Sequence, residues 1–273
     1  MFLQGGLGNQ LFQWSYSKYV ESLTGSLFNY SDLLLKLPLP GVTKRKVEIN
    51  KLLTNRRIIS SPQAFLKLLE SKTSLNKKLL VTDTNLQENY VGIKQKVFLG
   101  FFQSHIYIDL IWQELARELK NLEHFEFKND ATEDYLSAHI RLGDYLFNSK
   151  TNNHHGTVTA DYVVTALVKL REQLNLNKVK VITDSPEAIN PYLKTINDNG
   201  FVTQLVSQNQ VSDFHSLGKA KGIVISNSSF SWWAGYYANK RFDAKVVAPY
   251  PWFKNKEIEP VGLIPPNWHR CSK

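Results

Sequence analysis

Cysteine is almost absent from this chain. Its 273 residues include one, Cys271, so no internal disulfide and no multi-thiolate metal site can form. No apolar run approaches the roughly 18–20 residues that cross a bilayer, and no basic segment followed by an apolar one marks a signal peptide. We therefore expect a cytoplasmic protein, for which peripheral contact with the inner face of a membrane is an open option.

Acidic side chains are fewer than basic ones. The chain has 33 Lys and Arg against 24 Asp and Glu, which gives a net charge of +9. Such an excess favours anionic partners, namely nucleic acid, acidic lipid headgroups or phosphorylated substrates. The basic residues are scattered and accompany no nucleic-acid-binding motif. We expect a phosphorylated substrate and no nucleic acid.

The chain also lacks the Asp-x-Asp pair that holds a divalent cation beneath a diphosphate, because no two aspartates stand two residues apart. An arginine and a helix N-terminus would then have to neutralise a diphosphate leaving group. We expect neither a metal nor a cofactor.

The first residues contain a glycine-rich turn. A short strand is expected at Met1–Leu3, a turn at Gln4–Gln10 and a helix from Leu11, an order typical of nucleotide-binding folds. However, counting from Gly6 and Gly8, the third glycine of G-x-G-x-x-G is replaced by Leu11. The turn therefore disfavours a dinucleotide cofactor.

From about residue 135, short apolar runs alternate with helical patterns, which predicts a parallel sheet covered on both faces. The expected strands are Tyr135–Ile140, Lys178–Thr183, Phe201–Val206, Gly222–Ser226 and Lys245–Ala248. The expected helices are Ala160–Leu174, Pro186–Ile196, Asp213–Lys219 and Phe230–Ala238, preceded by a helix near Pro62–Leu69, a strand at Val97–Gln103 and a helix over Ile108–Leu122.

Polar residues lie at or just after the ends of three of these strands, at the edge where ligands of parallel sheets bind. In chain order they are His139, Arg141, Asp144, Asp184, Asn227, Ser228 and Ser229. Arg141 is the best diphosphate ligand, because a guanidinium is planar and always charged. The alternative for Arg141 is a salt bridge to Asp144. His139 is either an acid–base group or a buried, hydrogen-bonded histidine.

The later two clusters also have two interpretations. Asn227, Ser228 and Ser229 open a helix, where backbone N–H groups and the helix dipole favour an anion, although ordinary N-capping needs the same residue types. Asp184 either accepts hydrogen bonds from guanine or ribose or adds charge to the first turn of the next helix. The aromatic residues Phe230, Trp232 and Trp233 either stack on a base or belong to the core, with at least one tryptophan expected in the core.

Taken together, these motifs resemble the α-1,2-fucosyltransferases of glycosyltransferase family 11, and the resemblance spans nearly the whole chain. The segments that carry it are Gly5–Gln13, Gly100–Ser104, His139–Tyr145, Asp184–Glu187, Ser226–Trp233, Pro251–Phe253 and Ile264–Trp268. The resemblance implies a GT-B fold of two Rossmann-like lobes with a cleft between them. We place the acceptor-side lobe at residues 1–134 and the GDP-fucose lobe at 135–273, with a tail that is free to cross back.

The implied reaction is inverting, metal-independent transfer from GDP-β-L-fucose to O2 of a galactoside in a glycan. Mapped onto this sequence, Arg141 resembles the β-phosphate ligand. The other residues that the resemblance implicates are Asp184 as a guanosine contact, Asn227, Ser228, Ser229 and Phe230 as the donor loop, Gly6, Gly8 and Asn9 facing the fucose and acceptor, and Asp144 and His139 as candidate bases. Many members have a second arginine where this chain has Leu142, so Arg141 is the only guanidinium in its motif.

Two other functions fit the same sequence. One is a transferase of the same fold that uses another sugar nucleotide or a protein acceptor. The other is a non-catalytic module that binds a glycan or a nucleotide.

Overall fold

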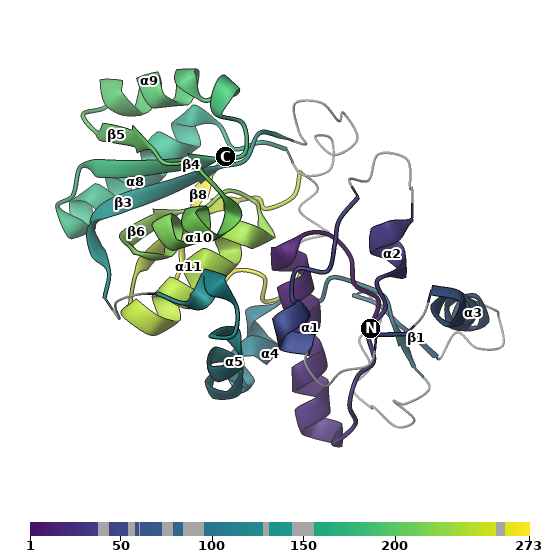
Figure 1. Cartoon of the computed structure of the whole chain (residues 1–273). Helices are drawn as coiled ribbons and strands as arrows, with labels where there is room; N and C mark the ends of the chain where they lie inside the picture. Colours follow the sequence, from purple (N-terminus) through teal and green to yellow (C-terminus); the bar gives the residue numbers. More distant parts are fainter. Residues whose placement is uncertain are drawn as a thin grey trace. The chain divides into compact units, whose positions relative to one another are not determined.

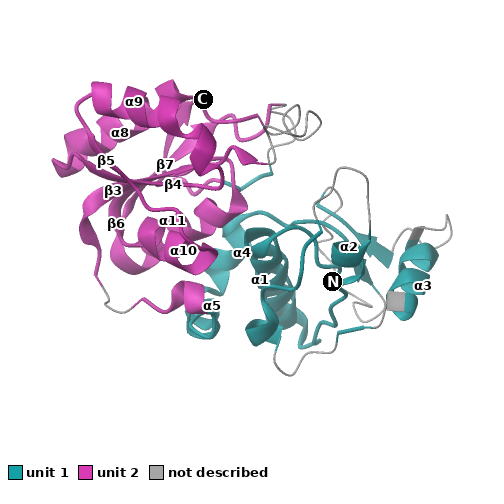
Figure 2. Ribbon diagram, turned by 45° about the horizontal axis from the view of Figure 1, so that its top comes forward, with its two compact units in different colours: residues 1–122, 260–263 teal, residues 123–259, 264–273 magenta. Residues whose placement is uncertain are grey.

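The chain folds into two compact units (Figures 1 and 2). The computed structural model describes residues 1–37, 44–53, 58–59, 61–72, 79–83, 96–127, 131–143, 156–254 and 260–273. Unit 1 comprises Met1–Leu122 and Pro260–Leu263, and unit 2 comprises Glu123–Glu259 and Ile264–Lys273. Both contain helices and parallel strand pairing, so the expected α/β class is confirmed. The cleft expected between two lobes stays a prediction.

The units divide at residue 122, whereas the sequence pattern placed the division at residue 134. Aromatic packing explains the difference. Phe125 lies 4.8 Å from Phe214 between ring centroids, and Phe127 stacks 5.4 Å from Tyr237. These contacts attach the segment before the first expected strand to the second unit.

Unit 2 is built on one six-stranded parallel sheet. Its strands are β3 (Glu133–Ile140), β4 (Lys178–Thr183), β5 (Val202–Leu205), β6 (Ala220–Val224), β7 (Lys245–Tyr250) and β8 (His269–Ser272). They are ordered β5-β4-β3-β6-β7-β8, which is the order of the doubly wound dinucleotide-binding fold. Figure 1 shows helices on both faces of the sheet.

Among the described residues, α8 (Ala160–Leu174) and α9 (Asn190–Asp198) cover one face of this sheet, and α10 (Gln210–Gly218) and α11 (Ser229–Phe242) cover the other (Figure 1). Because both faces are covered, the central strand β3 is buried from Tyr135 to Ile140. On the α8 side, Leu136 and Val181 pack with Leu167 in one core cluster.

The predicted strands of unit 2 all occur, with ends within two residues of those expected. Three details differ. β8 was not predicted; it pairs in parallel with β7 and contains Cys271. The expected helix at Pro186–Ile196 is two elements, a 3₁₀ helix at Pro186–Ala188 and then α9, because Pro191 is tolerated only in a first helical turn. α10 begins at Gln210 rather than Asp213, and the Asn209 side chain caps it by accepting from Val211 N–H and Ser212 N–H.

Unit 1 has a smaller parallel core. Its elements are α1 (Leu7–Thr24), α2 (Leu33–Lys36), a 3₁₀ helix (Asn50–Leu53), α3 (Ser61–Lys72), β1 (Leu80–Val81), β2 (Val97–Phe98), α4 (His105–Leu110) and α5 (Trp112–Leu119). β1 and β2 are parallel, and isolated bridges join Phe2 to Ser31 and Tyr30 to Ile58. In the part of the chain that the structure describes, no helix combines the length and hydropathy needed to span a membrane.

In unit 1 the strand expected at Val97–Gln103 ends at Phe98, and two expected helices were wrong in detail. The first helix begins at Leu7, not Leu11, because the Gln10 N–H already donates to the Gly6 carbonyl and closes a turn. The expected helix over Ile108–Leu122 is broken at Ile111, whose φ of −123° leaves the helical region. The two pieces still bury Ile108 and Leu115, as the apolar spacing predicted.

Candidate functional site

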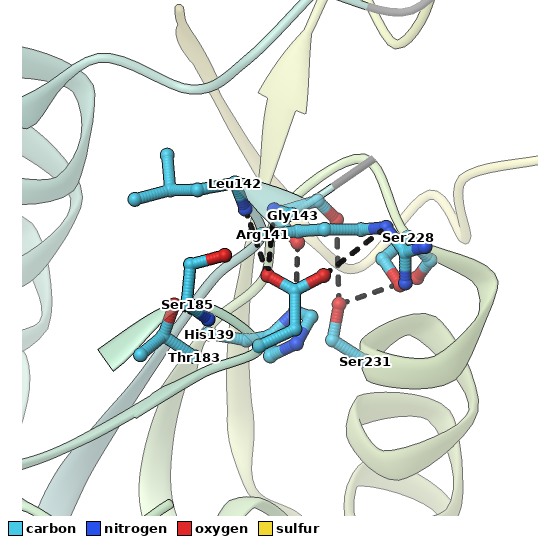
Figure 3. Close-up of polar contacts among 10 residues, drawn as sticks. His139, Arg141, Leu142, Gly143, Thr183, Ser185, Ser228 and Ser231 are labelled. Atoms are coloured by element: carbon cyan, nitrogen blue, oxygen red, sulfur yellow. Dashed lines mark hydrogen bonds and ion pairs between the residues drawn. The ribbon is translucent and has the colours of Figure 1, made fainter. Parts of the chain in front are cut away.

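The topology of unit 2 singles out one edge of the sheet. The chain runs from β3 outward to β4 and β5, and then returns to place β6 on the other side of β3. Ligands of open parallel sheets bind at such a switch point, outside the carboxyl ends of the strands. The loop after β3 carries Arg141, and the loop after β6 carries Ser228. In Figure 3 the Arg141 side chain extends in the direction of Ser228.

Asp184, which follows β4, holds the loop after β3 in place. Its Oδ1 accepts hydrogen bonds from the backbone N–H groups of Leu142 at 2.9 Å and Gly143 at 3.0 Å, and its Oδ2 lies 3.9 Å from Arg141 Nε (Figure 3). Burial alone would raise the pKa of Asp184. The two N–H donors and the Arg141 charge outweigh it, so the pKa is lowered and the carboxylate stays ionised.

This arrangement adds a role for Asp184 that neither sequence interpretation contained. The carboxylate fixes the backbone that follows Arg141 and lies within ion-pair distance of its guanidinium. The expected guanosine contact of Asp184 stays a prediction. The alternative salt bridge from Arg141 to Asp144 also stays untested, because Asp144 lies outside the described residues.

His139, near the end of β3, is a buried and hydrogen-bonded histidine. Its Nδ1 lies 2.7 Å from Ser226 Oγ, its ring centroid is 5.8 Å from that of Phe230, and its residue surface is 5% exposed. Burial lowers the pKa of His139 to about 4, a shift that Asp184 opposes and Arg141 reinforces. The imidazole is therefore neutral near pH 7, and it joins the carboxyl end of β3 to the loop after β6.

The lowered pKa of His139 predicts a loss of stability in acid. An unfolded histidine takes up a proton below about pH 6.5, whereas the folded one does so only near pH 4. The stabilising effect is thus complete above about pH 6.5 and is lost as the pH falls toward 4, by roughly 3 kcal/mol. Urea unfolding at a series of pH values over this range should show a smaller fall in the free energy of unfolding for His139→Gln than for the wild type. An equal fall in the two proteins would contradict this prediction.

The N-terminus of α11 lies on the other side of the switch point. Ser228 is the N-cap residue by backbone conformation, but its side chain makes no capping hydrogen bond. The Ser231 hydroxyl instead donates to the Ser228 carbonyl at 3.2 Å. The first N–H groups of a helix have no partner within it, so the Ser229 and Phe230 backbone can donate to an anion. Ser229 and Phe230 are half-buried.

Asn227 has a structural role that the sequence did not predict. Its buried amide nitrogen donates to the carbonyls of Gly156 at 2.9 Å and Trp252 at 3.2 Å. The side chain thereby ties together three loops of unit 2. Trp232 and Trp233 are both fully buried, so neither is available to stack on a base.

Gly143 is packed against the Asp184 carboxylate. A Cβ at this position would lie 2.8 Å from Asp184 Oδ2, closer than side chains normally approach. Gly143→Ala should therefore displace the carboxylate and with it Arg141, lowering kcat/KM about 10- to 100-fold, as small misplacements do at catalytic sites. In an Asp184→Ala background the same glycine change should cost little. An equal cost in both backgrounds would exclude this explanation.

In unit 1, the first two sequence motifs meet. Gly6 is the N-cap residue of α1, and Gly8 and Asn9 lie in its first turn. Asn9 Oδ1 accepts from Gln103 Nε2 at 2.9 Å, and Gln13 Nε2 donates to the Gly100 carbonyl at 2.8 Å. The predicted contact of these glycines and Asn9 with fucose and acceptor stays a prediction.

Glutamines hold this motif, and sequence analysis assigned them no role. Gln10 Nε2 donates to the carbonyls of Gly5 and Lys46, while its Oε1 accepts from Glu48 N–H. The sequence signal for this role was the presence of three glutamines within the two motifs, since buried amides usually satisfy backbone groups.

Among the described residues, no group of three or more His, Cys, Asp or Glu is placed to hold a metal ion.

Comparisons with known proteins give consistent results. The model of Glycosyl transferase family 11 matches residues 2–268. An alpha-1,2-colitosyltransferase of Escherichia coli is 28% identical, with 99% of this chain and 98% of that protein covered. The E. coli O-antigen biosynthesis glycosyltransferase WbnK is 23% identical, with 92% and 93% covered.

Solved structures show more distant likenesses. POFUT1 in complex with GDP-fucose is 12% identical, with a TM-score of 0.40 and coverage of 87% of this chain and 93% of that chain. The E. coli heptosyltransferase WaaC with ADP is 10% identical, with a TM-score of 0.45 and coverage of 99% and 92%.

Proposed function

We propose a function for this chain, which belongs to glycosyl transferase family 11. It transfers L-fucose from GDP-β-L-fucose to O2 of a terminal galactoside. The transfer inverts the configuration and needs no metal ion. The acceptor would be part of a bacterial surface glycan. Two relatives support this setting: one is named for α-1,2 transfer of a related sugar and the other for O-antigen biosynthesis.

The observation that carries the proposal is the arrangement at the switch point of unit 2. Arg141 follows β3, the uncapped N-terminus of α11 follows β6, and Asp184 fixes the loop that bears Arg141. A guanidinium and a set of helix N–H groups are suited to a diphosphate, because both offer positive charge and directed donors. Together they would replace a divalent cation in stabilising departing GDP.

The proposed chemistry is a single displacement. The acceptor hydroxyl attacks C1 of the fucose from the face opposite the diphosphate, the C1–O bond to GDP breaks, and the configuration inverts. Positive charge develops on the sugar, so a base is needed for only part of the barrier. Asp144 is the sequence-based candidate for the group that accepts the hydroxyl proton. His139 is buried and hydrogen-bonded to Ser226, which suits it to positioning.

A second donor is favoured by the relative named as a colitosyltransferase. Colitose is fucose without the 3-hydroxyl group, so the same site would accept GDP-colitose if no side chain requires that hydroxyl. A site built to hydrogen-bond it would reject the deoxy sugar strongly, because a buried polar group would lose its partner.

The purified chain should be incubated with GDP-fucose or GDP-colitose and a panel of β-galactosides, with GDP release and product linkage measured. We expect sugar transfer to O2 that is unaffected by EDTA, with little release when the acceptor is omitted. Arg141→Ala serves as the slow comparison, with transfer expected to be about 10²- to 10³-fold slower. Absence of transfer from both donors to every galactoside would refute the proposal, and loss of activity in EDTA would refute its metal-independent form.

A further inference from the structure

The two units share one structural device, an aspartate that holds a neighbouring loop. In unit 2, the Asp184 carboxylate follows β4 and accepts hydrogen bonds from the loop after the adjacent strand β3. In unit 1, Asp83 follows β1, and its Oδ2 accepts from Phe101 N–H at 2.9 Å and its Oδ1 from Phe102 N–H, both in the loop after the adjacent strand β2. Each carboxylate thus fixes a loop at the carboxyl end of a parallel strand, where ligands of such sheets bind.

The close packing of a glycine against the carboxylate is also shared. A Cβ on Gly100 would lie 2.6 Å from Asp83 Oδ2, as one on Gly143 would lie 2.8 Å from Asp184 Oδ2. Both distances are shorter than side chains normally allow, so each loop needs a glycine at this position. Asp83 stands 18 and 19 residues before its two partners, so local sequence patterns do not reveal its role.

Other contacts hold the same loop of unit 1, Gly100–Gln103. Phe102 has a φ of 54°, in the left-handed region that a bulky side chain rarely adopts. Such a backbone persists only where its surroundings over-determine it, and it recurs at ligand sites. The buried Phe102 ring stacks 4.3 Å from that of Tyr16, and Gln13 Nε2 donates to the Gly100 carbonyl. The loop is therefore fixed through its N–H groups, a carbonyl and a buried ring.

The fixed loop ends in Gln103, which orients Asn9. Gln103 Nε2 donates to Asn9 Oδ1 at 2.9 Å. The Asn9 amide nitrogen lies against Gly5, so closely that a Cβ on Gly5 would overlap it. This pairing directs the carbonyl of the Asn9 amide to Gln103 and leaves its NH₂ group to donate to a hydroxyl or ring oxygen of a sugar. Asn9 and Gln103 are both half-buried, so a ligand can reach them.

We propose that Asp83 is a positioning residue for the acceptor: it holds the Gly100–Gln103 loop so that Gln103 turns the Asn9 NH₂ group toward a sugar oxygen. The inference rests on the proposed function and on the predicted contact of Asn9 with fucose and acceptor. Asp83 gives the loop of unit 1 the support that Asp184 gives the loop of unit 2. It acts through Gln103 and Asn9 and not by contact with the reacting atoms.

The test is the kinetics of Asp83→Ala with the donor and the galactoside that the wild type turns over. We expect kcat/KM for the acceptor to fall about 10- to 100-fold, as small misplacements of substrate-positioning groups do. The dissociation constant of GDP, whose proposed site is in unit 2, should not change. Gln103→Glu should act in the same direction, because a carboxylate has nearly the shape of the amide but cannot donate to Asn9 Oδ1.

An Asn9→Ala background makes the test specific. Asn9→Ala alone should lower kcat/KM for the acceptor. Adding Asp83→Ala should then cost little more, because the effects of residues in one hydrogen-bond network are not additive. A purely structural role of Asp83 would cost the same in both backgrounds. Should Asp83→Ala fail to fold, the same comparison with Gln103→Glu replaces it.

Thr24→Ala is the matched control. The Thr24 hydroxyl donates to the Val20 carbonyl and accepts from Ser26 N–H, so this change also removes two hydrogen bonds from unit 1. Thr24 lies fifteen residues along α1 from Asn9, which is about 22 Å at the helical rise. Thermal melting should show lower stability for Thr24→Ala, whereas its kcat/KM should equal that of the wild type.

Three results would overturn this proposal alone: turnover by Asp83→Ala equal to that of Thr24→Ala, an equal cost of Asp83→Ala in the two backgrounds, or a matching loss of GDP binding, which would show an effect on the whole chain. A wild-type chain that transfers no sugar to any galactoside would instead refute the proposed function, and this inference with it.

Discussion

Arg141→Ala is expected to lower kcat about 10²- to 10³-fold, the range found when one preorganised donor to developing negative charge is removed. The negative charge on GDP grows as the bond to the sugar breaks, so the loss should appear more in kcat than in KM. Arg141 is also the only guanidinium of its motif, because Leu142 follows it. The measurement is steady-state GDP release with GDP-fucose and a saturating galactoside.

Two variants make this result specific. Arg141→Lys keeps a charge but loses the planar fork that binds two oxygens at once, and should recover part of the rate. Arg171→Ala removes an arginine of α8 that donates to the Asn199 carbonyl and lies 4.5 Å from the centre of the Phe201 ring. This second variant should lose stability but keep its kcat. Near-normal turnover by Arg141→Ala would refute the assignment of Arg141.

Asp184→Ala is expected to lower kcat/KM about 100-fold although this carboxylate is not placed against a reacting atom. The change leaves the Leu142 and Gly143 N–H groups without their acceptor and removes the carboxylate that faces Arg141. Arg141 would then adopt other conformations, and misplacement of a ligand of the transition state is costly. We also expect a loss of about 1–2 kcal/mol in the free energy of unfolding, because two hydrogen bonds are lost.

Asp184→Asn separates the two contributions of the carboxylate. An amide oxygen can still accept from the backbone of the loop, but it no longer provides a charge opposite Arg141. Stability near that of the wild type combined with reduced kcat would show that the charge orients Arg141. If Asp184→Ala instead raises only KM for the donor and leaves kcat unchanged, the guanosine contact that the sequence resemblance implies is the better explanation.

Local sequence patterns were sufficient for most of unit 2. β4 and α8 occur with the predicted limits, because a Val- and Ile-rich run and a helical apolar spacing are each bounded by polar residues. β8 was missed because only Cys271 among its four residues is buried, which gives no alternating pattern. Its strand conformation depends on pairing with β7, a contact far away in the sequence.

The candidate site was predictable in position but less so in its internal contacts. Strand ends can be located from the sequence, and the parallel sheet then brings Arg141, Asp184 and Ser228 to one edge. The sequence could not show that Asp184 holds the loop of Arg141. Asp184 is 42 residues away in the chain from its hydrogen-bond partner Leu142 and 41 residues away from Gly143. Nor could the sequence show whether Trp232 and Trp233 stack on a base or pack in the core, because core and binding aromatic residues share the same spacing.

The sequence by itself determined the family, the α/β class and Arg141 as the cation of its motif, because these follow from residue type and order. Only the tertiary structure decided that His139 is neutral, that Asn227 joins loops and that Asp184 holds the loop of Arg141. Each of these properties depends on burial or on a hydrogen bond between distant segments. Burial and long-range hydrogen bonds arise when the chain is folded, and they set the charge and orientation of side chains that the sequence can only name.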